Sequence, residues 1–176
     1  MKKYLKLIFL IALAACTTKV EVTKEPTKAE IDIIMDAWHQ AAADADFEKY
    51  FSYFESDSSI FMGTDATERW TVAVFKPWSK PFFDRGRAWS FKAVKRYVYF
   101  SEDGKTAWFD EELDTPNLGP SRGTGVLNKT DNGWKIVHYN LTIPIPNELT
   151  DEFIPKIDSV LNNLNSINKN GRHAGK

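Results

Sequence analysis

The segment Thr106 to Asp114 sets acidic side chains among aromatic ones with the alternation of a β-strand. One face would carry Trp108, Asp110 and Glu112, and the other Ala107, Phe109, Glu111 and Leu113. The second face is the more apolar, yet it includes Glu111, so either face brings an acid beside aromatic surface. A carboxyl group walled by aromatic rings loses hydration, and its pKa rises toward values useful to a general acid or base. The alternative is an exposed acid pair, or a salt bridge to Arg122.

Two histidines are candidate partners for such an acid. His138 lies in a predicted strand, where it would share a face with Trp134 and Ile136, and His39 lies in the first predicted helix. A pair formed by Asp110 and either histidine would be an acid/base couple. The alternative for both histidines is a hydrogen-bonded structural role. Because the three histidines of the chain lack the spacing of metal ligands, we expect neither a metal nor another cofactor.

Arginine and tryptophan side chains supply further candidates for ligand binding. The glycines of residues 121–125 (SRGTG) suggest a phosphate-binding loop, but that loop requires a following helix, whereas a strand follows here. We therefore interpret these glycines as a bend in the strand. Arg122 could bind an anionic ligand, with pairing to Glu111 or Asp110 as the alternative. Trp70 could form the rim of a pocket, with helix packing as the alternative.

Hydrophobic spacing predicts the elements that hold these residues. Helices are expected over residues 31–45, 47–54, 65–75 and 154–164, and strands over 59–62, 89–100, 106–114, 122–129 and 134–143. Asp46 should cap the second helix and Asp65 the third, which Pro77 and Pro81 should end or kink. The pair Asp103-Gly104 marks a hairpin turn. Helices followed by a meander of antiparallel strands predict an α+β fold, with helices on one face of a curved sheet.

The N-terminus has the pattern of an export signal. Three lysines within the first six residues precede an apolar run over residues 7–13, about half of the ~20 residues that a membrane-spanning helix needs. Leu13-Ala14-Ala15-Cys16 then resembles a bacterial lipobox, which implies cleavage before Cys16 and acylation of that cysteine. Several acyl chains make a stable anchor, so we expect a lipid bilayer as partner and a bacterial cell envelope location. The alternative is an ordinary signal peptide with an incidental cysteine.

Composition limits the classes of function. Removal of the signal takes three of the 23 basic residues, so 20 basic residues remain against 24 acidic ones. The net charge of the mature chain is then −4, and we expect no nucleic-acid partner. Six Trp, six Tyr and twelve Phe suit a deep apolar interior. The expected organisation is a signal peptide over 1–15, a flexible tether over 16–29, one domain over 30–147, a helix over 148–167 and a polar tail over 168–176.

Several short motifs follow one another along the domain. They are Ala37-Trp38-His39, Gly63-Thr64-Asp65, Glu68-Arg69-Trp70, Arg85-Gly86-Arg87-Ala88-Trp89, Ala107-Trp108-Phe109-Asp110-Glu111, Arg122-Gly123-Thr124-Gly125 and Trp134-Lys135-Ile136-Val137-His138-Tyr139. In this order they resemble the SnoaL-like branch of the nuclear transport factor 2-like (NTF2-like) superfamily. The resemblance implies a cone, a bent sheet around a long helix with a pocket inside, and a homodimer formed through the sheet. It also favours Trp108 and Asp110 as the pocket-facing residues of their strand.

These considerations give a set of candidate site residues. The candidate catalytic residues are Asp110 and His138, and the candidate ligand-binding residues are Trp38, His39, Tyr50, Trp70, Trp108, Arg122 and Tyr139. Steroid-isomerase-like relatives carry a tyrosine and a basic aspartate where this chain has Trp38 and Met62, which cannot do that chemistry. We expect a lipoprotein that binds a small, largely apolar molecule in an aromatic-lined cone. The alternatives are a dehydratase or cyclase type of enzyme using the same pocket, or an envelope protein-interaction module.

Overall fold

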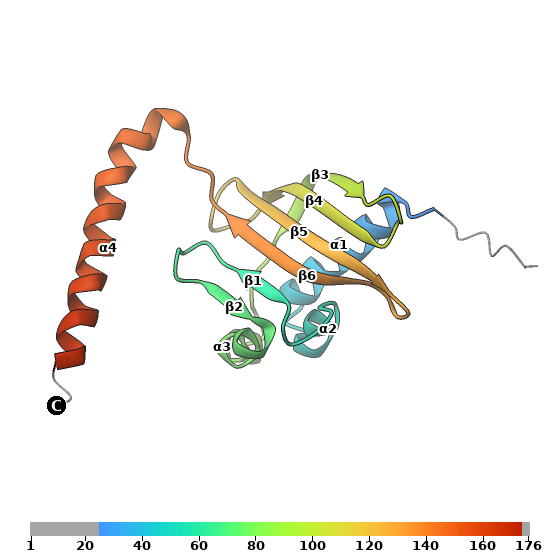
Figure 1. Cartoon of the computed structure of the whole chain (residues 1–176), viewed down its shortest axis with the longest axis horizontal. Helices are drawn as coiled ribbons and strands as arrows, with labels where there is room; N and C mark the ends of the chain where they lie inside the picture. Colours follow the sequence, from blue (N-terminus) through green and yellow to red (C-terminus); the bar gives the residue numbers. More distant parts are fainter. Residues whose placement is uncertain (1–24, 174–176) are drawn as a thin grey trace, which may run out of the picture.

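The structure of the protein is a computed structural model that describes the backbone of residues 25–173 and the side chains of residues 25–163. The expected signal peptide, Cys16 and most of the expected tether lie outside the described residues. An α+β architecture is observed, as predicted (Figure 1).

Two consecutive helices open the domain. They are α1 (Lys28–Ala43) and α2 (Phe47–Ser52). The break between them has the predicted cause, because the side chain of Asp46 accepts a hydrogen bond from the backbone N–H of Lys49 at 3.1 Å. Ala45, just before this cap, adopts a positive φ of 55° that turns the chain into the new helix direction.

Six strands form one curved sheet. They are β1 (Ile60–Met62), β2 (Arg69–Thr71), β3 (Lys92–Phe100), β4 (Thr106–Asp114), β5 (Ser121–Thr130) and β6 (Gly133–Thr142), in the spatial order β2-β1-β6-β5-β4-β3. The predicted antiparallel meander is confirmed for β3 to β6. The sheet as a whole is mixed, because β1 pairs in parallel with β6. This short strand supplies hydrogen-bond partners to an edge of β6 that would otherwise be unpaired.

The third helix differs from its prediction. α3 spans Val72–Asp84, so it starts later than expected. Asp65 and Glu68 instead stabilise a turn that leads into β2, in which the backbone N–H of Glu68 bonds to the Asp65 carbonyl at 2.9 Å. Pro77 and Pro81 lie inside α3 and do not end it. Buried residues at a spacing of four hold this helix against the core despite the lost backbone bonds. They are Phe75, Ser79 and Phe83.

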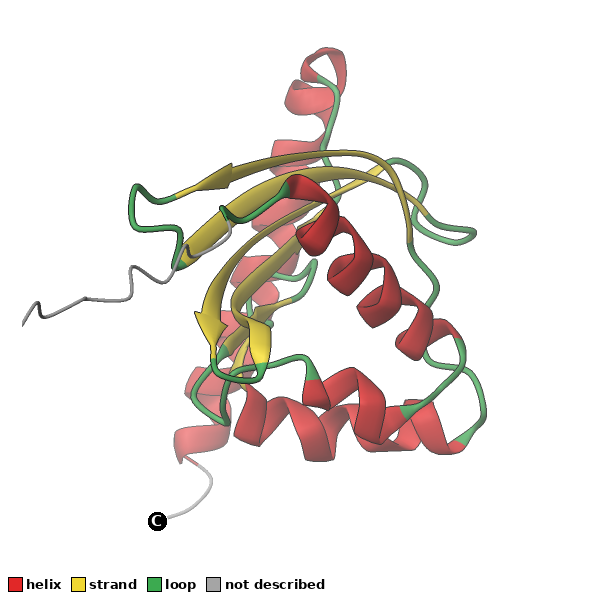
Figure 2. Cartoon of the chain, turned by 90° about the vertical axis from the view of Figure 1, so that its right-hand side faces the viewer, coloured by secondary structure: helices red, strands yellow, loops and turns green. Residues whose placement is uncertain are grey.

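The helices cover the concave face of the sheet. Figure 2 shows the strands arching over α1, with further helices closing the far side. Their apolar faces meet the inner face of the sheet in one core whose largest buried side chains are aromatic or aliphatic. They include Ile31, Met35, Trp38, Tyr50, Phe75, Leu127, Ile136 and Tyr139.

A final helix extends away from the domain. The short 3₁₀ turn η1 (Asn147–Leu149) leads into α4 (Thr150–His173), which stands clear of the sheet in Figure 1 and continues past the expected end at residue 167. Its predicted apolar stripe is exposed to solvent at Ile154, Ile157 and Leu161. None of the helices within residues 25–173 combines the length and the apolar character that crossing a bilayer requires.

Candidate functional site

The acid that β4 directs into the interior is Glu111, which is only 1% exposed. Its Oε1 accepts hydrogen bonds from the Tyr139 hydroxyl at 3.0 Å and contacts His39 Nε2 at 2.9 Å. Its Oε2 accepts a hydrogen bond from Arg96 Nε at 2.8 Å and forms an ion pair with Arg96 Nη2 at 2.7 Å. Three side chains, from α1, β3 and β6, therefore meet at the carboxylate that β4 carries.

Electrostatics keep Glu111 ionised despite its burial. Burial alone raises the pKa of its carboxyl group, but the hydrogen bond and charge of His39, and then those of Arg96, lower the pKa by more. The net result is a pKa below the ordinary glutamate value. Burial and the neighbouring Glu111 carboxylate raise the pKa of Tyr139 well above its ordinary value, so this hydroxyl remains a donor.

The arrangement around Glu111 is one of structural support. Both carboxylate oxygens are occupied by protein donors, which leaves the group poorly placed to take a proton from a substrate. Arg96 continues the network to the surface, where Nη1 bonds to Asp32 at 3.1 Å and Nη2 to Asp36 at 2.9 Å. The network thereby fastens α1 to the sheet.

The strand face expected to line the pocket is the outer one, so that prediction is wrong. Trp108 is 45% exposed and stacks on Tyr99 of β3, with ring centroids 5.9 Å apart. Asp110 lies on the same outer face, because Phe109 and Glu111 on either side of it point inward. The inner face of β4 is the more apolar one, and its single acid, Glu111, is paired with Arg96 within the core.

His138 also lies on the outer face, and a bulge explains why. Ile136 pairs with Leu127 and His138 with Val126, so Val137 is an extra residue that reverses the alternation. His138 is half-buried, and its pKa is lowered by burial and then by the charge of Arg69. β5 separates its strand from that of Asp110, a gap of about 10 Å between strand axes, so these two residues do not form an acid/base couple.

The other predicted site residues fall into three places. Core positions are occupied by Trp38, His39, Tyr50 and Tyr139. Arg122 is exposed on the outer face of β5, and Glu111 pairs with Arg96 instead. Only Trp70 lines the pocket described next.

An aromatic pocket opens at the end of the sheet where the β1–β2 turn, α3 and the β4–β5 loop converge. Its volume is about 150 Å³. The lining residues are Phe61, Gly63, Thr64, Glu68, Trp70, Phe75, Trp78, Trp89, Phe91, Leu118 and Leu141. Six of these are aromatic, and Glu68 is the one with a charged side chain. The cavity is thus an apolar chamber with a single carboxylate.

The rings of this aromatic pocket support one another. Phe75 stacks on Phe61 at 4.2 Å and on Trp70 at 5.4 Å between ring centroids. Trp70 in turn contacts Trp78 at 4.6 Å, and Trp78 is 43% exposed, so the pocket opens to solvent there. Trp89 packs edge-on against Tyr50 at 5.6 Å and separates the pocket from the deeper core.

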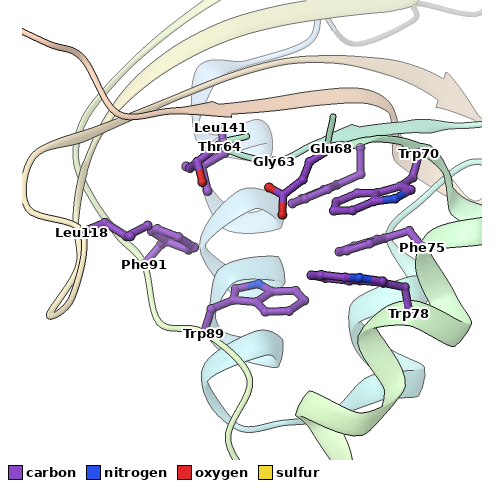
Figure 3. Close-up of a pocket in the computed structure, with 11 residues that line it drawn as sticks. Gly63, Thr64, Glu68, Trp70, Phe75, Trp78, Trp89, Phe91, Leu118 and Leu141 are labelled. Carbon is purple, nitrogen blue, oxygen red and sulfur yellow. The ribbon is translucent and has the colours of Figure 1, made fainter. Parts of the chain in front are cut away.

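Glu68 is held over the pocket by local geometry. Its Oε2 accepts a hydrogen bond from the Asp65 backbone N–H at 3.2 Å, and its side chain lies directly against Gly63. Figure 3 shows the carboxylate pointing into the pocket toward Trp78 and Trp89. Within the described part of the chain, no three metal-binding side chains gather at one point.

Sequence reasoning missed most of this pocket. Trp78 lies in no predicted element, Trp89 is predicted only as the start of a strand, and Glu68 appears only in a short motif without a site role of its own. The available signal was the density of tryptophan between residues 70 and 89, three of the six in the chain. It could not identify a pocket, because Phe61, Leu118 and Leu141 come from segments far apart in the sequence.

The comparisons with known proteins agree with this fold. Residues 31–146 match the SnoaL-like domain family, and the chain belongs to that family. No curated protein matches the sequence.

Solved structures with the same fold are distant in sequence. A domain of unknown function with a cystatin-like fold from Nostoc punctiforme is 19% identical, with a TM-score of 0.53 over 82% of this chain and 99% of that one. A candidate dehydratase of the NTF2-like family from Streptomyces avermitilis is 16% identical, with a TM-score of 0.55 over 67% and 96% of the two chains. The association domain of C. elegans CaMKII is 16% identical, with a TM-score of 0.51 over 65% and 94%. At these identities the likeness establishes the fold alone.

Proposed function

We propose that this protein is a lipid-anchored binding protein that holds a small, largely apolar molecule in the aromatic pocket. The observation that carries the proposal is a chamber of about 150 Å³ lined by six aromatic rings and open at Trp78. An apolar cavity of roughly that size binds a molecule as large as benzene in an engineered protein. The energy of binding would come from removing apolar surface from water.

The lining favours binding over catalysis. It includes no histidine, cysteine, lysine or tyrosine, so Glu68 would be the one acid/base group available to a substrate. Glu111, the strongest catalytic candidate by burial, has both oxygens occupied by His39, Tyr139 and Arg96. A dehydratase or cyclase type of reaction is the second candidate, and it would rest on Glu68 alone.

The pocket lies at the end of the sheet opposite the start of the described chain. Pro26, close to the start of the described chain, lies against Gly104 in the β3–β4 hairpin. Leu118, which lines the pocket, belongs to the β4–β5 loop at the other end of β4.

Replacing the exposed pocket tryptophan should weaken binding with little cost to folding. The probes are neutral molecules of six to ten non-hydrogen atoms, indole and cyclohexanol among them, titrated by calorimetry. Trp78→Ala should weaken their binding about tenfold, since losing one ring wall removes roughly 1–2 kcal/mol of apolar contact. Trp108→Ala is the matched control, because Trp108 is equally exposed but lies on the outer face. Equal losses in the two variants, or no binding by the unaltered protein, would count against the pocket.

The tether has its own test. Full-length protein produced in a bacterial host with radioactive palmitate should carry the label and sediment with membranes. Cys16→Ser should remove the label and move the protein out of the membrane fraction, since Cys16 is the sole cysteine of the chain. Thr17→Ser serves as the control and should leave both properties unchanged. A Cys16→Ser protein that still sediments with membranes would exclude anchoring through this residue.

A further inference from the structure

The carboxylate of Glu68 lies in the wall of an apolar chamber. Its Oε2 receives a hydrogen bond from the Asp65 backbone N–H, and no lysine, arginine or histidine lines the pocket. Among residues 25–163, none of the basic side chains forms an ion pair with it. Glu68 is partly exposed in the open pocket, and a ligand that covers it removes its water, which is costly unless the ligand brings a positive charge. The protein itself does not provide that charge, so a ligand is the natural source.

The rest of the pocket suits a cation as well. Three tryptophans line it, and the face of an indole ring attracts a positive charge more strongly than other aromatic rings do. Figure 3 shows Trp78 and Trp89 across the pocket from the Glu68 carboxylate, and Trp70 beside the Glu68 side chain. A ligand cation would thus meet aromatic rings on one side and a carboxylate on another, both of which favour positive charge.

We infer that the aromatic pocket binds an alkylated ammonium group, such as a quaternary trimethylammonium. This inference rests on the proposed binding function and specifies its ligand class. The shortage of acceptors distinguishes alkylated from primary ammonium, because Thr64 and Glu68 are the two lining residues whose side chains carry oxygen. A primary ammonium has three N–H donors and would leave some unsatisfied, whereas a quaternary ammonium has none and presents apolar methyl groups to the rings.

Gly63 leaves room for the Glu68 carboxylate in this position. A methyl group at Gly63 would overlap with Glu68 Oε2 and lie 3.0 Å from the carboxyl carbon. The flexible end of the Glu68 side chain can move away, so Gly63→Ala should displace the carboxylate while the domain stays folded. This substitution therefore tests the placement of the charge separately from its presence.

The decisive experiment compares two ligands of the same shape. Choline and 3,3-dimethyl-1-butanol differ in a nitrogen replaced by carbon, and so in charge alone. Calorimetry on the unaltered protein should show choline binding at least about tenfold more tightly. Glu68→Gln and Gly63→Ala should each reduce that preference, since the tryptophan rings remain, and leave the neutral alcohol unaffected. Glu112→Gln, an acid on the exposed outer face, is the matched control and should preserve the preference.

The outcomes separate this inference from the proposed function. Equal binding of the two ligands, or binding of neutral probes without choline, would overturn the ammonium assignment and leave the apolar binding function in place. Failure of choline and of every neutral probe would overturn both. Ethanolamine should bind more weakly than choline, and equal affinity would contradict the preference for an alkylated group.

Two sources could present the same ammonium chemistry, a free small molecule or a lipid headgroup. Sedimentation with phosphatidylcholine vesicles, compared with phosphatidylglycerol vesicles, distinguishes them in protein that lacks the lipid-modified Cys16. Choline binding together with selective sedimentation on phosphatidylcholine would assign the site to a headgroup. Choline binding without that sedimentation would assign it to a free ligand.

Discussion

Replacing Arg96 with methionine is expected to lower the free energy of unfolding by about 3–5 kcal/mol near neutral pH. Methionine fills a similar volume but leaves Glu111 in the core without its guanidinium partner. Glu111 is 1% exposed, and Arg96 supplies one hydrogen bond and one ion-pair contact to its carboxylate. Chemical denaturation of the two proteins at pH 7 measures this difference. Lys95→Met, an exposed neighbour on the same strand, is the control and should change stability by less than about 0.5 kcal/mol.

The loss from Arg96→Met should depend on pH. In the unaltered protein the pKa of Glu111 is lowered on folding, so its contribution is complete above the ordinary glutamate pKa and is lost as pH falls through the folded-state value. Without Arg96 the pKa of Glu111 is lowered less, so a fall in pH costs the variant less stability than it costs the unaltered protein. The stability difference should therefore shrink when the pH falls from 7 to 4. A difference that stays constant over this range would show that the cost comes from packing alone.

The order and type of most elements were predictable because local signals agreed with one another. Asp46 lies between the apolar stripes of the first two helices and caps the second helix, as expected. Gly104, in the predicted Asp103-Gly104 turn, has the positive φ of 64° that a tight hairpin requires. Asp65 and Glu68, three residues apart, also have the spacing of a helix cap, but they are followed by strand β2 and not by a helix. A capping pattern stabilises a turn whether or not a helix continues from it.

The orientation of β4 could have been predicted from its neighbour. Glu111 occupies the apolar phase of β4, and Arg96 occupies the same phase of β3 as Val98 and Phe100. The two are paired across the hairpin, so opposite charges coincide on an otherwise apolar face. That coincidence indicates a buried ion pair. The bulge at Val137, in contrast, has no glycine or proline to mark it, which is why the face of His138 was not predictable.

Gly123→Ala is expected to disrupt the core beneath the sheet. The added methyl group would overlap with the Tyr139 hydroxyl and lie 2.7 Å from Glu111 Oε1. These two oxygen atoms are buried and joined by a hydrogen bond. The added methyl group would separate them, and water could not reach either atom to replace that hydrogen bond. We expect a loss of about 2–4 kcal/mol in the free energy of unfolding, combining overpacking with an unsatisfied polar group. Urea denaturation measures it.

Two further variants test whether the loss of stability comes from this contact or from any substitution in β5. Thr124→Ala, on the opposite face of the same strand, should cost less than about 1 kcal/mol. Tyr139→Phe removes one of the two overlapping oxygens, so Gly123→Ala should cost less in that background than in the unaltered protein. Additive losses in the double variant, or a Gly123→Ala loss as small as that of Thr124→Ala, would contradict the account. If the coupling is found, Gly123 leaves room beside β5 for a buried carboxylate that ties the sheet to α1.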